Sequence, residues 1–366
     1  MRLMHGDYEF SVQSVVMQPT SFCNIDCTYC YLPFRHANQI MSEDIAENVA
    51  EGLAGIIDRS VNVIWHGGEP LTCGIRHVLR LIQPFELLRQ RKLVTHVIQT
   101  NATLIDEKWC GLFKTYGFEV GISIDGPAWA NKQRLSRGKR DTFLQSMQGI
   151  KMLRDNGVPF SAICVVTEET IGHAVELYQF FCELGCHSVG FNVEEKVGIH
   201  TKCCSSVQNV RSFWKNLFEA WSQTPTVLIR EFNHVLTWMN ALCRDGGKSE
   251  TAVQYDIFPS VSRTGDVVFL SPEFLDAHSS KYHNFIVGNV REHSLAKLVK
   301  KFHSLNYVSD FLKGVERCRR ECGYFEICRG GDASNKFFEH GTTNATETVH
   351  CTNTKQQLTK AILEVL

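Results

Sequence analysis

The sequence carries no excess of charge of either sign. Its 38 lysines and arginines balance 39 aspartates and glutamates, which leaves a formal net charge of −1. Proteins that bind nucleic acid or an anionic membrane surface through their overall field have a strong basic bias. The composition therefore predicts neither of these partners.

Long hydrophobic runs are also absent. No apolar stretch approaches the roughly 20 residues that a membrane-spanning helix needs, and the first residues, Met1 to Gly6, do not form a secretory signal peptide. The chain nevertheless holds 15 cysteines. Without a secretory signal, this number argues against a disulfide framework and for metal ligation in a reducing compartment. We expect a cytoplasmic protein.

Internal repeats, low-complexity tracts and flexible linkers are likewise absent, and the first part of the chain alternates strand and helix patterns. The expected strands cover 14–18, 61–65, 96–99, 120–124, 160–166 and 188–193. The expected helices cover 75–91, 106–116, 142–156 and 172–184, after a first helix with Ser42 as its N-cap. Six strands in this alternation indicate an α/β fold, an incomplete (β/α)6 barrel of the TIM type with its chemistry at the carboxyl ends of the strands.

Three cysteines follow the first expected strand: Cys23, Cys27 and Cys30, spaced C-x3-C-x2-C. A structural zinc site closes with four ligands, whereas an iron–sulfur cluster held by three thiolates keeps one iron open for another molecule. Tyr29 and Tyr31 add aromatic bulk that can line a nucleoside pocket. Three buried, reduced cysteines without a metal are the alternative, because free cysteine packs as a small hydrophobic residue.

This spacing, with an aromatic residue before the last cysteine, resembles the radical S-adenosylmethionine (SAM) enzymes. The resemblance implies that Cys23, Cys27 and Cys30 hold a [4Fe–4S] cluster whose open iron binds the amino and carboxylate groups of SAM. Three further segments resemble the family's GGEP, QTN and SxDGP motifs, namely Gly67 to Pro70, Gln99 to Asn101 and Ser123 to Pro127. Each alone is more often a turn or a helix cap, but all follow expected strands in the family's order.

The same resemblance implies which residues contact SAM: Tyr29, Gly67, Gly68, Glu69, Gln99, Asn101, Ser123, Asp125 and Arg134. Arg134 matches the arginine that follows the DGP segment in the family and would pair the SAM carboxylate. The family's usual His-Asp pair before this arginine is replaced here by Ala130-Asn131.

A second group of cysteines lies near the end of the chain: Cys318, Cys322, Cys328 and Cys351. Four cysteines complete an iron–sulfur site, and zinc is the local alternative. The group resembles the auxiliary-cluster (SPASM) domain of peptide-modifying radical SAM enzymes, which implies one auxiliary [4Fe–4S] cluster in an otherwise loop-like segment. We expect a barrel domain over 1–225 and the auxiliary domain over 226–366, with a helix over 295–303.

The sequence departs from that domain's pattern at two places. Asp332 stands where the family has a further cysteine, and an expected β-hairpin carries Ser260 and Ser271 but no cysteine. Its strands are expected over 257–260 and 267–270, joined through Gly265. The departure predicts one auxiliary cluster where other members hold two. The adjacent Cys203 and Cys204 are expected to be structural.

Finer segments resemble the maturases that form three-residue cyclophanes in ribosomally made peptides (GrrM and XyeB type). They are Gly190 to Glu195, Leu270 to Glu273, Cys322 to Cys328 and Ser334 to Glu339. The resemblance implies a precursor peptide as substrate and an external electron donor such as flavodoxin or ferredoxin. A SAM-derived radical would take hydrogen from a Cβ, and the carbon radical would add to an aromatic ring. We expect a monomer without a separate leader-binding domain.

Loss of one electron and one proton would then restore the ring. The auxiliary cluster is the implied electron acceptor, and Asp332, Glu194 and Glu195 are candidates for the proton acceptor, although exposed carboxylates are usually only solvated. Thioether formation and sulfatase-type oxidation of Ser or Cys use the same clusters and stay open. An iron–sulfur sensor or electron carrier is the non-enzymatic alternative, against which the SAM-pocket segments argue.

Overall fold

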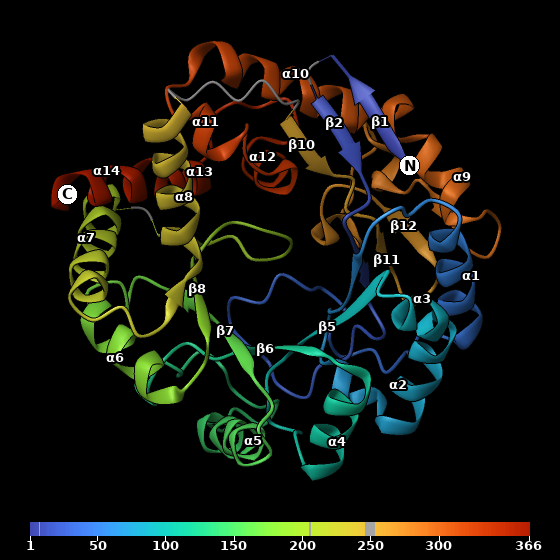
Figure 1. Cartoon of the computed structure of the whole chain (residues 1–366), viewed down its shortest axis with the longest axis horizontal. Coiled ribbons are helices and arrows are strands. Elements are labelled where there is room, and N and C mark those ends of the chain that lie inside the picture. Colours follow the sequence, from blue (N-terminus) through green and yellow to red (C-terminus); the bar gives the residue numbers. More distant parts are fainter. Residues whose placement is uncertain (7, 205, 246–252) are drawn as a thin grey trace.

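The computed structural model describes residues 1–6, 8–204, 206–245 and 253–366, and a curved parallel sheet forms its centre (Figure 1). Each strand of this sheet pairs in parallel with the next along the chain. The strands are β3 Ser14–Met17, β4 Val61–Trp65, β5 Val94–Thr100, β6 Glu119–Ser123, β7 Phe160–Val166, β8 Ser188–Val193 and β9 Leu228–Ile229. All six expected strands are present, and the predicted α/β fold class is confirmed. The short strand β9 was not expected.

Helices connect the strands along the outside of the sheet (Figure 1). They are α1 Glu43–Ala54, α2 Ile75–Ile82, α3 Glu86–Gln90, α4 Glu107–Tyr116, α5 Phe143–Asp155, α6 Ala174–Leu184, α7 Val207–Gln223 and α8 Arg230–Asp245. The apolar side chains whose spacing predicted these helices are buried against the sheet. In α1 they are Ile45, Val49 and Leu53.

One expected helix is wrong in detail, and one expected N-cap is confirmed in position only. The helix expected over 75–91 is broken by a 3₁₀ turn, Gln83–Phe85, because Pro84 lacks a backbone N–H and its ring clashes with the preceding turn. Ser42 occupies the N-cap position of α1 but makes no side-chain cap. Its Oγ instead accepts a hydrogen bond from Arg291 at 2.6 Å.

The central sheet continues past β3 into the second half of the chain. β11 Ser260–Val261 pairs in parallel with β3, and β12 Asp266–Val268 and β13 Gly288–Asn289 follow in antiparallel order. The expected hairpin is therefore present, with strands that lie inside 260–268 rather than at 257–260 and 267–270. Together the strands form one ten-stranded sheet. The barrel and the hairpin thus share one hydrogen-bonded framework.

A second, smaller sheet was not expected. It joins β1 Arg2–His5 and β2 Tyr8–Ser11 to β10 Val253–Asp256. This sheet places the start of the chain beside a segment that is far away in the sequence. Phe10, for example, pairs with Tyr255. No local pattern encodes such a pairing.

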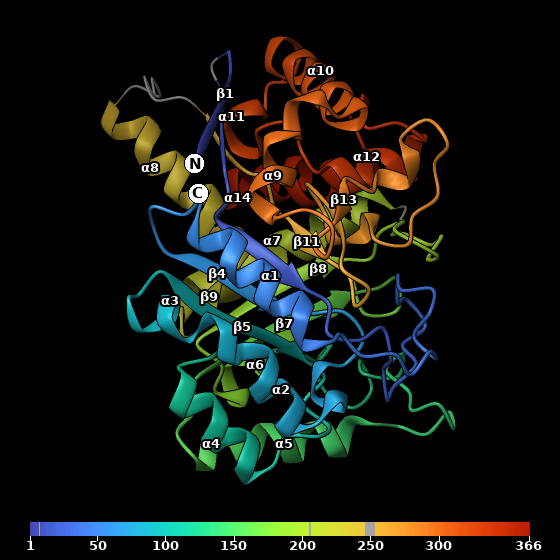
Figure 2. The same cartoon turned by 90° about the vertical axis from the view of Figure 1, so that its right-hand side faces the viewer.

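The last part of the chain is helical, so the expected loop-like segment is wrong. Its elements are α9 Leu295–Lys300, α10 Asn306–Glu321, α11 Phe325–Cys328, α12 Ala333–His340, α13 Val349–Cys351 and α14 Gln357–Val365. The helix expected over 295–303 ends at Lys300 and is followed by a separate 3₁₀ turn, Phe302–Ser304. Figure 2 shows α10 and α12 on the opposite side of the molecule from α4 and α5.

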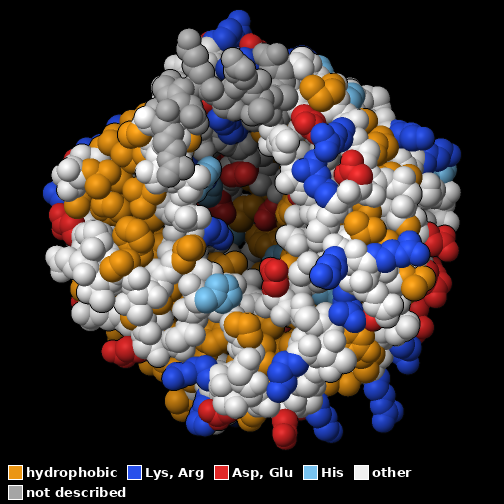
Figure 3. All heavy atoms as spheres, viewed as in Figure 1, with side chains coloured by type: hydrophobic (Ala, Val, Ile, Leu, Met, Phe, Trp, Pro, Cys, Tyr) orange, Lys and Arg blue, Asp and Glu red, His pale blue; other side chains and the backbone are white. Residues whose placement is uncertain are grey.

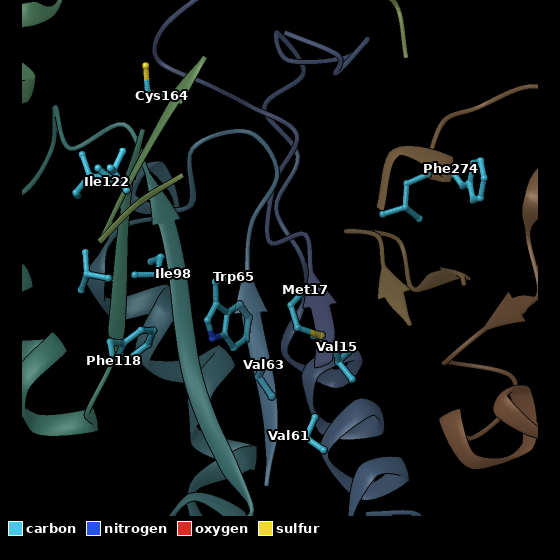
Figure 4. Close-up of a cluster of buried hydrophobic side chains, with 14 of the residues drawn as sticks. Val15, Met17, Val61, Val63, Trp65, Ile98, Phe118, Ile122, Cys164 and Phe274 are labelled. Carbon is cyan, nitrogen blue, oxygen red and sulfur yellow. The ribbon is translucent and has the colours of Figure 1, made fainter. Parts of the chain in front are cut away.

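One hydrophobic core runs through the molecule. Along β4, Val61, Val63 and Trp65 are buried while Asn62 is exposed, the alternation expected of a strand (Figure 4). Phe274, from the second half of the chain, belongs to the same core. The boundary expected between residues 225 and 226 stays a prediction. Within the described residues, no helix is both long and apolar enough to cross a membrane.

Candidate functional site

The three cysteines of the C-x3-C-x2-C segment lie in the loop after β3 and line one cavity of about 300 Å³, here the first cavity. The loop is fixed by Arg35, whose Nε lies 2.5 Å from Oδ1 of Asp26, and by Arg137, whose Nε donates to the carbonyl of Cys23 at 3.0 Å. Burial raises the pKa of Cys23 to about 12 and that of Cys27 to about 11. These thiols are therefore stable as thiolates only when a cation replaces their protons.

Most of the predicted SAM-binding residues gather around this cavity. Those that line it are Tyr29, Gly68, Glu69, Gln99, Asn101, Ser123 and Arg134. Gly67 and Asp125 are not part of its lining. The gathering follows from the parallel sheet, because the carboxyl ends of β3 to β6 meet at one edge.

The glycine pair after β4 is required by close packing against the cysteine loop. Gly68 has φ +59°, and a Cβ there would lie 2.3 Å from the carbonyl oxygen of Phe22. Any larger residue would push the loop away. The next residue, Glu69, donates its backbone N–H to the same carbonyl at 2.8 Å.

The carboxylate of Glu69 is occupied by the protein itself. It accepts hydrogen bonds from the N–H of Leu71 at 3.1 Å, from Oγ1 of Thr100 at 2.8 Å and from the N–H of Asn101 at 2.7 Å. Burial raises its pKa, and these donors act in the opposite direction. Glu69 thus ties the end of β4 to the end of β5.

Two further contacts connect neighbouring strand ends. Gln99 donates through Nε2 to Oγ of Ser123 at 2.8 Å. Asn101 donates through Nδ2 to Oδ1 of Asn24 at 2.9 Å, and the same nitrogen lies 3.9 Å from Sγ of Cys23. The side chain of Asn101 therefore connects the end of β5 to the cysteine loop.

Tyr29, Asp125 and Arg134 form one buried network. The hydroxyl of Tyr29 donates to Oδ2 of Asp125 at 2.5 Å and accepts from Nη1 of Arg134 at 2.7 Å. Oδ1 of Asp125 accepts from the N–H of Val165 at 3.0 Å. Asn131, which replaces an acidic residue of the family pattern, accepts the backbone N–H of Asp125 at 3.1 Å. Asp125 thus fixes Tyr29 and the end of β7 through hydrogen bonds, while part of the Arg134 side chain lines the first cavity.

The three predicted proton acceptors are placed differently. Glu194 lines the first cavity and pairs with His200, with Nε2 and Oε1 3.0 Å apart. Glu195 also lines the first cavity and lies 2.6 Å from Nδ1 of His350. The side chain of Asp332 is 62% exposed and lies away from this cavity.

Sequence reasoning missed Glu273 as a site residue. It follows β12, in the turn Pro272–Phe274, and lines the first cavity. Burial raises its pKa to about 7, and Oγ of Ser271 donates a hydrogen bond to its carboxylate. The motif Ser271-Pro272-Glu273 was visible, but only the pairing of β11 with β3 brings it to the barrel. Figure 3 shows a hollow near the centre of the molecule with acidic side chains in it.

The four remaining predicted cysteines line a second cavity of about 340 Å³, together with Asp332 and Lys336. Cys318 lies in the last turn of α10, Cys328 ends α11, and Cys351 ends α13. Burial raises the pKa of Cys318 to about 11. Among the described residues, no three His, Cys, Asp or Glu side chains are close enough to hold a single metal ion.

A larger cavity of about 750 Å³ lies between β2 and α10 and contains none of the predicted site residues. The volume of a cavity alone therefore does not identify the functional site of this protein. The two smaller cavities are the candidate functional site because they collect the predicted cysteines.

Comparison with known proteins places the first part of the chain in a known family. Residues 17–181 match the model of the Radical SAM superfamily. An uncharacterized protein, sll1766, of Synechocystis sp. is 34% identical over 96% of this chain and 91% of its own. The cysteine-type anaerobic sulfatase-maturating enzyme of Clostridium perfringens is 26% identical, over 87% of this chain and 88% of its own.

Two solved structures share the fold. The first, native anSMEcpe with bound AdoMet and Cp18Cys peptide, has a TM-score of 0.76 at 23% identity, with 96% of this chain and 97% of that chain covered. The second, Streptococcus suis SuiB bound to precursor peptide SuiA, has a TM-score of 0.62 at 17% identity, with 93% and 76% covered. These similarities extend over both halves of the chain.

Proposed function

Because the chain belongs to the radical SAM superfamily, and is therefore an enzyme whose cofactors are SAM and a [4Fe–4S] cluster, we propose that it oxidises a residue within a ribosomally made precursor peptide. The product that we propose is a carbon–carbon crosslink between a Cβ and a nearby aromatic ring, closing a three-residue cyclophane. A polypeptide substrate is supported by the relatives, one of which matures sulfatases and one of which was solved with its precursor peptide.

The observation that carries this proposal is the contact between the two cysteine-lined cavities. Glu195 of the first cavity reaches His350, the neighbour of Cys351 in the second. Crosslinking removes a hydrogen atom, an electron and a proton from the peptide. A protein that performs it needs a site for radical generation and, beside it, a site that accepts an electron.

The residues of the first cavity fit the cluster and SAM. Cys23, Cys27 and Cys30 supply three thiols on one wall, and Arg134, Asn101 and Ser123 supply polar groups on the others. Bound there, the cluster and SAM would supply radical chemistry able to take a hydrogen atom from the substrate. Arg134 is suited to hold the SAM carboxylate, while Tyr29 and Asp125 fix its orientation.

The residues of the second cavity fit one auxiliary cluster. Four thiols surround this space, as many as a [4Fe–4S] cluster needs. The hairpin carries Ser260 and Ser271, both buried, so no second set of thiols stands there. We propose this cluster as the electron acceptor.

Glu273 is the proton acceptor that the geometry supports best. Glu194 and Glu195 are paired with histidines, and Asp332 is exposed outside the first cavity. The pKa of Glu273, raised to about 7 by burial, suits a group that takes up a proton near neutral pH. We therefore propose Glu273 ahead of Glu194, Glu195 and Asp332.

Oxidation of the sulfatase type is the second candidate function, supported by the similarity to the sulfatase-maturating enzymes. One experiment separates the two: co-expression of the chain with a candidate precursor peptide, sought as a small open reading frame near its gene, followed by mass spectrometry of the peptide. A carbon–carbon crosslink loses two hydrogens, keeps every thiol and resists peptide fragmentation between the joined residues. An aldehyde that reacts with a hydrazine would instead establish the sulfatase-type reaction, and loss of a free thiol would establish a thioether.

The role of the auxiliary site is tested by Cys328→Ala. We expect loss of crosslinked product and of protease resistance in the last part of the chain, since metal binding and folding are coupled at such sites. SAM cleavage persists, because Cys23, Cys27 and Cys30 are untouched. A compact variant that crosslinks peptide at the normal rate would exclude the second cavity as support and as electron acceptor. Cys182→Ala, at a half-buried cysteine on α6, is the matched control.

A further inference from the structure

Lys336 on α12 is a buried cation beside the four cysteines of the second cavity. The residue is 1% exposed, and it lines that cavity. Among the described residues, Nζ has no hydrogen-bond partner. A buried, unpaired ammonium costs several kcal/mol unless an anion compensates it.

No described carboxylate forms a hydrogen bond with Nζ. The ring of Phe311 lies 4.9 Å from Nζ, a cation–π contact that compensates the charge only in part. Asp332 accepts the backbone N–H of Lys336 through its carbonyl, and its side chain is 62% exposed. Four cysteines line the same cavity as Lys336, and as neutral thiols they carry no charge.

Metal binding changes this balance. Four thiolates around an iron–sulfur cube leave the group with a net negative charge, and one added electron increases it. Burial lowers the pKa of Lys336, whereas ionised Cys318, Cys328 and Cys351, together with Asp332, act in the opposite direction. The ammonium is therefore stabilised by the loaded site and penalised by the empty one.

We propose that Lys336 is the counter-ion of the auxiliary cluster and raises its reduction potential, so that the cluster can accept the electron that the substrate releases. This inference rests on the proposed function. The step adds one electron to the cluster, from the substrate radical that has lost its proton to Glu273, and moves no proton to Lys336. A nearby positive charge favours the more negative, reduced cluster.

The residue next to Lys336 on α12 contacts the first cavity. Asn335 precedes it on α12 and donates a hydrogen bond through Nδ2 to Oε2 of Glu195 in the first cavity. Consecutive residues of one helix thus contact the two cavities. The charge beside the auxiliary cluster is held in place by the same helix that holds the wall of the substrate site.

The test measures the midpoint potential of the auxiliary cluster in the holoenzyme, by redox titration followed by electron paramagnetic resonance. Addition of SAM changes the signal of the first cluster and so identifies the auxiliary one. We expect Lys336→Met, which keeps the length but removes the charge, to shift this potential to more negative values. Lys336→Arg stays near wild type. The control is Lys360→Met, at a cation that lies 5.9 Å from the ring of Tyr324 and does not line the cavity.

A wild-type potential in Lys336→Met would overturn the proposal. Loss of auxiliary iron from Lys336→Met but not from Lys336→Arg would support it, and loss from both would overturn it because shape rather than charge would then matter. No measurement needs the peptide, so a failure of the proposed function is read separately.

Discussion

Oε2 of Glu195 lies 2.6 Å from Nδ1 of His350, and this contact joins the two cysteine-lined cavities. Glu195 follows β8 in the barrel, whereas His350 precedes the last cysteine of the second cavity. The carboxylate is also bonded to Asn335 of α12. A residue that looks like a free acid in the sequence is therefore a connection between the two sites.

Replacing Cys23, Cys27 and Cys30 together with Ala should abolish SAM cleavage but leave part of the iron bound. The thiols of the first cavity are removed, while the four of the second remain. The measurements are 5′-deoxyadenosine by chromatography and iron by colorimetry. Cys182, Cys203 and Cys243 changed together to Ala form the control, since none lines either cavity. Continued formation of 5′-deoxyadenosine would contradict the assignment.

Anaerobically reconstituted protein should hold about eight irons, because two four-iron clusters fit the two sets of cysteines. The hairpin offers serine where a further cluster would need cysteine, at Ser260 and Ser271. Iron and acid-labile sulfide are the measurements. A count of about twelve would require a third cluster that these cavities do not explain.

Glu273→Gln should lose crosslinked product while SAM cleavage continues uncoupled. Its folded pKa is raised to about 7, so the carboxyl is protonated, and unable to accept a proton, below that value. Product formation by the wild type should therefore rise with pH through about 7. Single-turnover product yield across neutral pH checks this. Glu194→Gln is the comparison variant. If product yield does not change with pH, or if Glu273→Gln gives the normal yield, another group accepts the proton.

Stability should fall as the protein is acidified, in part through His96. Burial lowers the folded pKa of His96 to about 4, against about 6.5 in an unfolded chain. Between these values the unfolded state binds more protons, so stability is lost as pH falls from about 6.5 toward about 4. At about 1.4 kcal/mol per pKa unit, the full loss is about 3 kcal/mol.

His96→Gln should flatten this pH dependence and still offer an oxygen acceptor to Trp65, whose Nε1 donates to Nδ1 of His96 at 3.2 Å. The midpoint of urea unfolding at several pH values is the measurement. His187→Gln, at an exposed histidine, is the control. An equal slope in both variants would mean that other groups dominate the acid response.

The first half of the fold could be predicted because each buried strand is a short apolar run and each helix has an apolar face. The second half could be predicted only in part, at the hairpin and at α9. α10 has the apolar spacing of a helix, at Tyr307, Val308, Phe311, Leu312 and Val315, but the metal-ligand pattern at its end favoured a loop. The small sheet depends on pairing between distant segments, which no local pattern records.

The site was predictable where the chemistry lies at strand ends, since parallel strands bring those ends together. The individual roles were not. Asp125 and Glu69 look like ligand-binding acids, yet their oxygens accept hydrogen bonds from the protein, and only the folded positions of Tyr29 and Thr100 reveal this. Glu273 needed the pairing of β11 with β3 to reach the cavity.

The pairing of β11 with β3 limits how the two halves of such a protein can be separated. The backbone N–H groups of Val16 and Gln18 donate to Pro259 and Val261, at 2.8 and 2.9 Å, on the strand that leads directly into the cysteine loop. A gene fragment that ended with the barrel would leave this strand as a bare edge, open to pairing with other chains. A second half taken from another protein would have to supply a strand in the register of β11 to cover this edge.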